Sequence, residues 1–176
     1  MPPKDAETEV MERDKLVLDL VSERFKVEWD LGSELDGKAS SLAGFVGIII
    51  SLQVGFGTIL IDKIPKTNPY HVYLYLFYFL GIIFLICSIL FAFRAYYLKE
   101  YSVAPNPEKL IEMAEKGESQ NGIVRKISVD MKIATFNNEQ VNNSKASNII
   151  RGFIFLVLGI ATMLMFAFSV IFSVGF

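Results

Sequence analysis

The chain has 176 residues, of which 52% are hydrophobic and 20% are charged, and its formal net charge at pH 7 is −2. This balance, with no strongly basic block, excludes a nucleic-acid groove, and the single cysteine excludes an intrachain disulfide. Three stretches, residues 39–61, 71–93 and 152–176, contain no charged side chain. Because a helix needs about 20 apolar residues to cross a bilayer, we predict an all-α integral membrane bundle with three transmembrane helices and long cytoplasmic helical extensions.

Residues 1–38 are predicted to form a cytoplasmic amphipathic arm that is one long helix. At 100° per residue its apolar side chains cover more than half of the circumference, and charged residues fill the remaining stripe. A face this wide is more than one neighbour buries, so we expect the arm to contact at least two. A helix lying in the membrane surface is the alternative, which the mixed signs of the polar stripe disfavour. The apolar positions are Met11, Leu16, Val17, Leu18, Leu20, Val10, Val21, Phe25, Val27, Trp29, Leu31 and Leu35.

Residues 39–61 form the first predicted transmembrane helix, which carries two features typical of helix contacts. Every fourth residue is small at Ala43, Gly47, Ser51 and Gly55, and such a row lets another helix backbone come close. We expect the partner to be the second or third span of the same chain, with a second copy as the alternative. Gln53 lies near mid-bilayer on roughly the opposite face. It is expected to bond another helix or, alternatively, to line a pore or binding site.

Three further polar residues stand at the predicted membrane boundaries. Asp36 and Lys38 flank the inner end of the first span, where we expect them to pair with each other or to reach toward lipid headgroups. His71, at the outer end of the second span, is interpreted as an interface residue rather than a metal ligand or an acid–base group, since no other ligand type lies beside it.

The second half of the chain alternates between membrane and cytoplasm. A short external loop is predicted at 62–70, and the second transmembrane helix at 71–97, with aromatic clusters at both ends. In the cytoplasmic helical connector, 98–148, Asn106 and Pro107 are typical of a helix start and Gly117 of a stop. A helix is expected to resume near Ile123 and to continue into the third transmembrane helix, 149–176, unless the polar stretch 137–145 interrupts it.

The distribution of Lys and Arg predicts the orientation. The arm has six of these residues and the segment 94–151 has nine, whereas the loop between the first two spans has two. Because cytoplasmic loops carry the excess of Lys and Arg, we expect a multi-pass protein of the cell membrane with its N-terminus in the cytoplasm and its C-terminus outside.

The sequence contains no motif that indicates catalysis or cofactor binding. The glycines form no phosphate-binding loop, no serine sits in a nucleophile elbow, and no cluster of residues has metal-ligand spacing. We therefore expect no enzyme, no catalytic residue, no cofactor and no metal.

Two parts of the chain resemble a known group of proteins. Leu35-Asp36-Gly37-Lys38-Ala39-Ser40-Ser41-Leu42 opens the first span, and Asn106-Pro107-Glu108 together with 137–145 leads toward the last span. In this layout the chain is similar to small prokaryotic membrane proteins, the Pycsar-type and SLATT-type effectors of nucleotide-sensing defence systems. The resemblance implies a protein that perturbs the membrane when it is activated.

The residues themselves favour a different function. We expect a non-enzymatic integral membrane protein that acts through helix–helix contacts as a scaffold, an accessory subunit or a small oligomer. Its partners would be the lipid bilayer and a second copy or another membrane protein, and not nucleic acid. The alternative is an oligomeric pore-forming or membrane-disrupting effector with Gln53 at the lumen.

Overall fold

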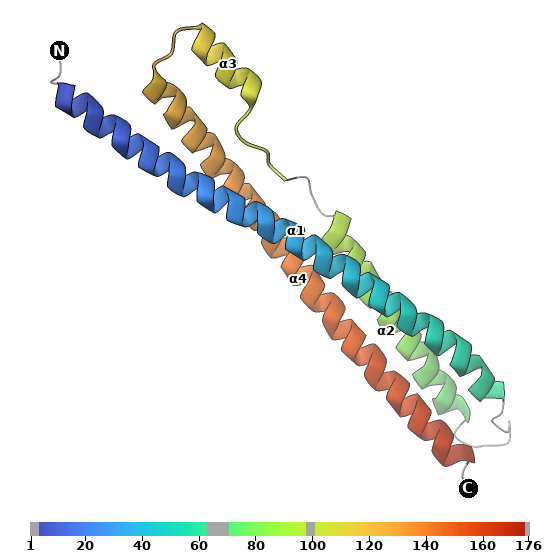
Figure 1. The fold of residues 1–176 in the computed structure, drawn as a ribbon. Helices are drawn as coiled ribbons and strands as arrows, with labels where there is room; N and C mark the ends of the chain where they lie inside the picture. The colour runs from blue at the N-terminus through green and yellow to red at the C-terminus, as the bar shows by residue number, and fades with distance from the viewer. Residues whose placement is uncertain (1–3, 63–70, 98–100, 175–176) are drawn as a thin grey trace. The chain divides into compact units, whose positions relative to one another are not determined.

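A computed structural model describes residues 4–62, 71–97 and 101–174, and within these residues all regular secondary structure is helical (Figure 1). The four helices are α1 (Lys4–Asp62), α2 (His71–Tyr97), α3 (Pro107–Glu115) and α4 (Gln120–Val174). Helices α1, α2 and α4 are long and apolar enough to cross a membrane. The all-α prediction is confirmed. Of the loop expected at 62–70, Asp62 is the last residue of α1, and residues 63–70 lie outside the described residues, as does the side chain of His71.

Two of the predicted segment boundaries fall inside continuous helices. α1 runs through the junction between the arm and the first span, and α4 runs through the junction between the connector and the third span. Neither junction contains a proline, so the backbone has no reason to break there. The polar stretch 137–145 does not interrupt α4, and several of its side chains find partners within the fold, among them Asn138, Asn142 and Lys145.

Helix α3 begins and ends at the predicted signals. The side-chain oxygen of Asn106 accepts hydrogen bonds from the backbone N–H of Glu108 at 3.0 Å and of Lys109 at 3.4 Å, and Pro107 occupies the first turn. Gly117, with φ of +75°, follows the last turn. This left-handed conformation favours glycine and stops the helix.

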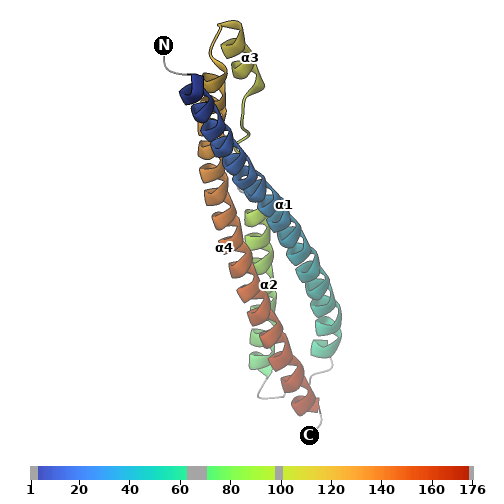
Figure 2. The same cartoon turned by 60° about the vertical axis from the view of Figure 1, so that its left-hand side comes forward.

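The described helices contribute to two compact units. The first comprises Met1–Glu34 and Lys99–Asn143, and the second comprises Leu35–Leu98 and Ser144–Phe176. In the second unit, parts of α1, α2 and α4 lie side by side in both views (Figure 2). Its core contains two buried clusters: Leu42, Val46, Leu85, Ala92 and Leu156, and separately Leu74, Tyr78, Phe166 and Val170.

Most buried positions of the three long helices follow one another at spacings of three or four residues. This average spacing of 3.5 residues keeps one narrow stripe of each helix facing its neighbours, as in a coiled coil. On α2 the buried stripe includes no charged side chain, whereas on α1 and α4 it includes Glu28 and Lys145. The stripe includes Glu28, Gly32, Leu35, Ala39, Leu42 and Val46 on α1, Leu74, Tyr78, Gly81, Leu85, Ser88, Ala92 and Ala95 on α2, and Asn138, Asn142, Lys145, Asn148, Gly152, Leu156 and Gly159 on α4.

Candidate helix-contact site

The row of small residues on α1 does not form the close intrachain contact that we expected. Ala43 packs against the core of the second unit. A Cβ atom added at Gly47 or at Gly55 would meet no described neighbour within 4 Å, and Ser51 is exposed and donates its hydroxyl to Gly47 O at 2.9 Å. Steps of four residues advance by about 40° beyond a full turn. The row therefore winds away from a stripe that repeats every 3.5 residues, and the expectation is wrong for Gly47 and Gly55 within one chain.

Other glycines form the close approaches in the second unit. An added Cβ would lie 2.7 Å from Leu85 Cδ2 at Gly159, 2.9 Å from Leu42 Cδ2 at Gly152, and 2.8 Å from Gln53 Nε2 at Gly81. At Gly152 it would also lie 3.2 Å from the backbone oxygen of Ser88. These glycines occupy the buried stripes of α2 and α4. Gly152 and Gly159 are seven residues apart, which is two steps of 3.5 residues. A search for small residues at every fourth position misses this signal.

Gln53 lies in the packed interior of the second unit. It is 4% exposed, and its Nε2 donates to the backbone oxygen of Tyr78 on α2 at 3.0 Å. This is the interhelical hydrogen bond that was one of its two expected roles. Its Oε1 is buried and has no hydrogen-bond partner among the described residues. Helix packing places Thr162 of α4 close by, but the Thr162 hydroxyl donates to its own helix at Leu158 O and Gly159 O.

Asp36 forms an ion pair with a residue that the sequence did not single out. Its Oδ1 lies 2.5 Å from Nζ of Lys145 on α4, and the Lys145 side chain is only 3% exposed. Asp36 is therefore an interhelical residue rather than only a boundary charge. Lys38 is exposed on the same helix.

A polar contact joins α1 to α4 in the first unit. Asn142 Nδ2 donates to the Glu28 carboxylate at 2.9 Å and to the Glu28 backbone oxygen at 2.8 Å. Tyr101 Oη donates to Asn142 Oδ1 at 2.6 Å, and its ring stands 5.7 Å from that of Trp29. Burying a carboxylate without a hydrogen-bond donor is costly. The hydrogen bond from Asn142 offsets part of this cost for Glu28.

A second charged contact joins the same helices. Arg125 Nε donates to Asp14 Oδ2 at 2.9 Å, and Arg13 contributes a longer contact of 3.4 Å. Burial of the Asp14 carboxyl raises its pKa, but the hydrogen bonds and positive charges of Arg125 and Arg13 together lower it by more, so its pKa lies below the ordinary value. The arm and the connector are thus joined in the first unit by the opposite charges of Asp14 and Arg125.

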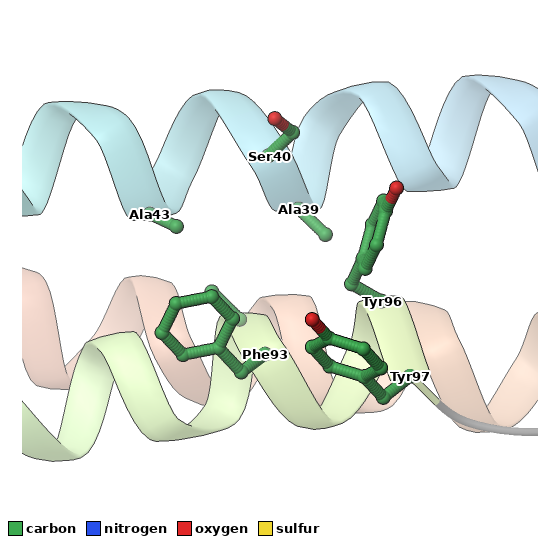
Figure 3. A pocket seen from close by; sticks show the side chains of 7 residues that line it. Ala39, Ser40, Ala43, Phe93, Tyr96 and Tyr97 are labelled. Carbon is green, nitrogen blue, oxygen red and sulfur yellow. The ribbon is translucent and has the colours of Figure 1, made fainter.

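A small cleft opens between α1 and α2 in the second unit (Figure 3). It encloses about 120 Å³, and α1 contributes Ala39, Ser40 and Ala43 to its lining. α2 contributes the rest of the lining, Ala92, Phe93, Tyr96 and Tyr97. Three hydroxyl groups and otherwise apolar atoms supply no acid–base pair and no metal ligands. The cleft is suited to apolar contact rather than to chemistry.

No described group of three or more His, Cys, Asp or Glu side chains is placed to hold a metal ion, and Cys87 is a free, half-buried thiol. Comparison with protein families, with curated proteins and with solved structures found no match to this chain. The candidate site is therefore defined by its own geometry, as a set of polar and glycine contacts along helix seams.

Proposed function

We propose that the chain is an integral membrane protein that works without catalysis, through helix–helix contacts, as a scaffold, an accessory subunit or a small oligomer. The observation that carries this proposal is the outer surface of the second unit. Large apolar side chains on all three helices point outward, including Phe45, Ile48, Phe56, Leu90 and Ile154. Such a surface is unfavourable in water and well suited to lipid.

The buried polar groups of the second unit support contact rather than chemistry. Ser88 donates to Gly152 O at 2.7 Å, Gln53 donates to Tyr78 O, and Lys145 pairs with Asp36. Each group joins one helix to another, as polar side chains commonly do within membrane bundles. We place the arm and the connector in the cytoplasm and the C-terminus outside, on the basis of the Lys and Arg distribution.

A second candidate is the oligomeric pore or membrane-disrupting effector, which is also what the resemblance to Pycsar-type and SLATT-type effectors implies. The buried Oε1 of Gln53 without a partner is the observation that favours it, because polar atoms in membrane helices often line water. A pore would require Gln53 to leave its contact with Tyr78 and face a lumen.

Two measurements on the full chain test the proposal. The protein should remain in the membrane fraction after alkaline carbonate extraction, and release into the soluble fraction would contradict the membrane anchor. Purified protein should leave liposomes tight to a trapped dye and to ions. Leakage that depends on protein and that Gln53→Leu abolishes would favour the pore instead.

A further inference from the structure

In the first unit, helix α1 carries a second row of regularly spaced residues, separate from the buried stripe that faces α4. We call this row the second seam. Val17, Leu20, Arg24, Val27 and Leu31 follow one another in steps of three, four, three and four residues. The apolar members are between 38% and 59% exposed, and the Arg24 side chain is 63% exposed. This spacing is that of the contact positions of a coiled coil, with one polar residue at the middle.

The centre of this second seam is an open hollow between side chains of α1. An open hollow of about 460 Å³ is lined by Leu20, Glu23, Arg24, Val27 and Glu28. The first four residues stand at positions i, i+3, i+4 and i+7, which is the set that forms a hole for a side chain of a facing helix. The hollow is therefore where a side chain of a second helix along this seam would insert.

We propose that the occupant is α1 of a second copy of this chain, lying parallel and in register along the second seam. The parallel direction rests on the proposed function, because two copies rooted in one membrane by the same spans point their arms the same way. In register, each apolar position of the seam meets its own counterpart. An isologous contact of this kind needs a surface that is complementary to itself.

Charge supports the pairing of two identical helices. Arg24 stands at the middle of the second seam and Glu23 lies beside it on the flank. In a parallel, in-register pair Arg24 of each copy enters the hole that includes Glu23 of the other, and the two Glu23 carboxylates thereby offset the repulsion between the two Arg24 side chains. Among the residues that the structure describes, Arg24 forms an ion pair with the exposed Glu139 at 4.0 Å, a contact that is weak at this exposure. A lipid surface fits less well, because the seam has a cation and an anion at its centre rather than a uniform apolar or basic face.

Disulfide trapping tests the direction and the register. In a Cys87→Ser background, Leu20→Cys in the full chain should form a covalent dimer in membranes under mild oxidation. Ser33→Cys, an exposed position of α1 that lies off the seam, is the matched control. At least fivefold more dimer at position 20 than at position 33 supports the proposal, and equal yields would overturn it.

Charge exchange tests the contact itself. Arg24→Glu should raise the Kd of the detergent-solubilised dimer by about tenfold, and the double variant Glu23→Arg/Arg24→Glu should restore it. Glu139→Gln, which removes only the intrachain contact, should leave the dimer intact. Loss of the dimer in Glu139→Gln, or no rescue by the double variant, would contradict the proposal. Helical circular dichroism checks that each variant is folded. Failure here with full membrane retention would reject the arm contact and leave the membrane anchor standing, so the two proposals fail separately.

Discussion

Substitution of Gly32 by alanine should leave the stability of the first unit unchanged or lower it, although alanine is the better helix former. A Cβ built at Gly32 lies 2.8 Å from Tyr101 Cε1 and closer still to Cζ and Oη of the same ring. The ring has little freedom to withdraw, because its hydroxyl is bonded to Asn142 at 2.6 Å and its centroid lies 5.7 Å from that of Trp29. Gly37, five residues further along α1, has no neighbour within 4 Å of its added Cβ and is the matched control.

The two effects have opposite signs and can be weighed. Replacing glycine by alanine within a helix contributes about 1 kcal/mol of stability, so Gly37→Ala should raise Tm. Overpacking of a filled site costs about 1–3 kcal/mol, which cancels or exceeds that gain in Gly32→Ala. The two variants should therefore differ by about 1–3 kcal/mol, and a change of 1 kcal/mol moves Tm by about 2–4 °C in a chain of this size.

Thermal unfolding of the purified chain in mild detergent, followed by circular dichroism and by the fluorescence of Trp29, measures this difference. Trp29 is the only tryptophan, so its emission reports on the surroundings of Tyr101. Adding Tyr101→Leu to Gly32→Ala should recover stability relative to the sum of the two single changes. If both alanine variants raised Tm equally, the close approach of Tyr101 to α1 would be refuted.

Three further predictions concern polar groups. Asn142→Leu should cost about 1.5–3 kcal/mol by leaving the Glu28 carboxylate without its donor, while Asn143→Leu at an exposed neighbouring position should change the unfolding free energy by less than about 0.5 kcal/mol; equal effects in chemical denaturation would contradict this contact. Gln53→Leu should maintain Tm, because removal of a buried oxygen that has no partner among the described residues offsets the loss of the hydrogen bond to the backbone oxygen of Tyr78; a large loss of Tm would contradict this balance. The depressed pKa of Asp14 predicts stability that is fully present above the unfolded pKa of about 3.9 and is lost as pH falls through the lower folded value. The difference in Tm between wild type and Asp14→Asn should therefore be constant from pH 7 to about pH 5 and shrink below about pH 4; a difference that shrinks near neutral pH would be inconsistent with that shift.

The helices could be predicted from the sequence because the signals for them are local. Charge-free runs mark the three apolar segments, and the cap at Asn106 and the stop at Gly117 depend only on neighbouring residues. The absence of proline also predicts that α1 continues past Lys38. These features require no knowledge of which residues meet across the fold.

The contacts could not be predicted in the same way, because hydrophobic periodicity disregards polar residues. Asn142 and Lys145 belong to the buried stripe of α4, but they appear in the sequence only as part of a polar stretch. Leu20 and Val27 look like core residues and are exposed. A search for small residues at every fourth position selects Gly47. The buried stripe repeats on average every 3.5 residues and includes Gly152 instead. A search that counts polar, small and apolar residues together at spacings of three and four would have found the buried stripes.

The mass of the purified full chain in mild detergent, corrected for bound detergent by light scattering, tests the central claim most directly. Contact between helices of separate copies predicts a mass of two or more chains that falls to one chain when Val27→Asp places a charge in the second seam. A wild-type protein with the mass of a single chain, unchanged by Val27→Asp, would contradict the claim that copies of this chain contact one another along the second seam.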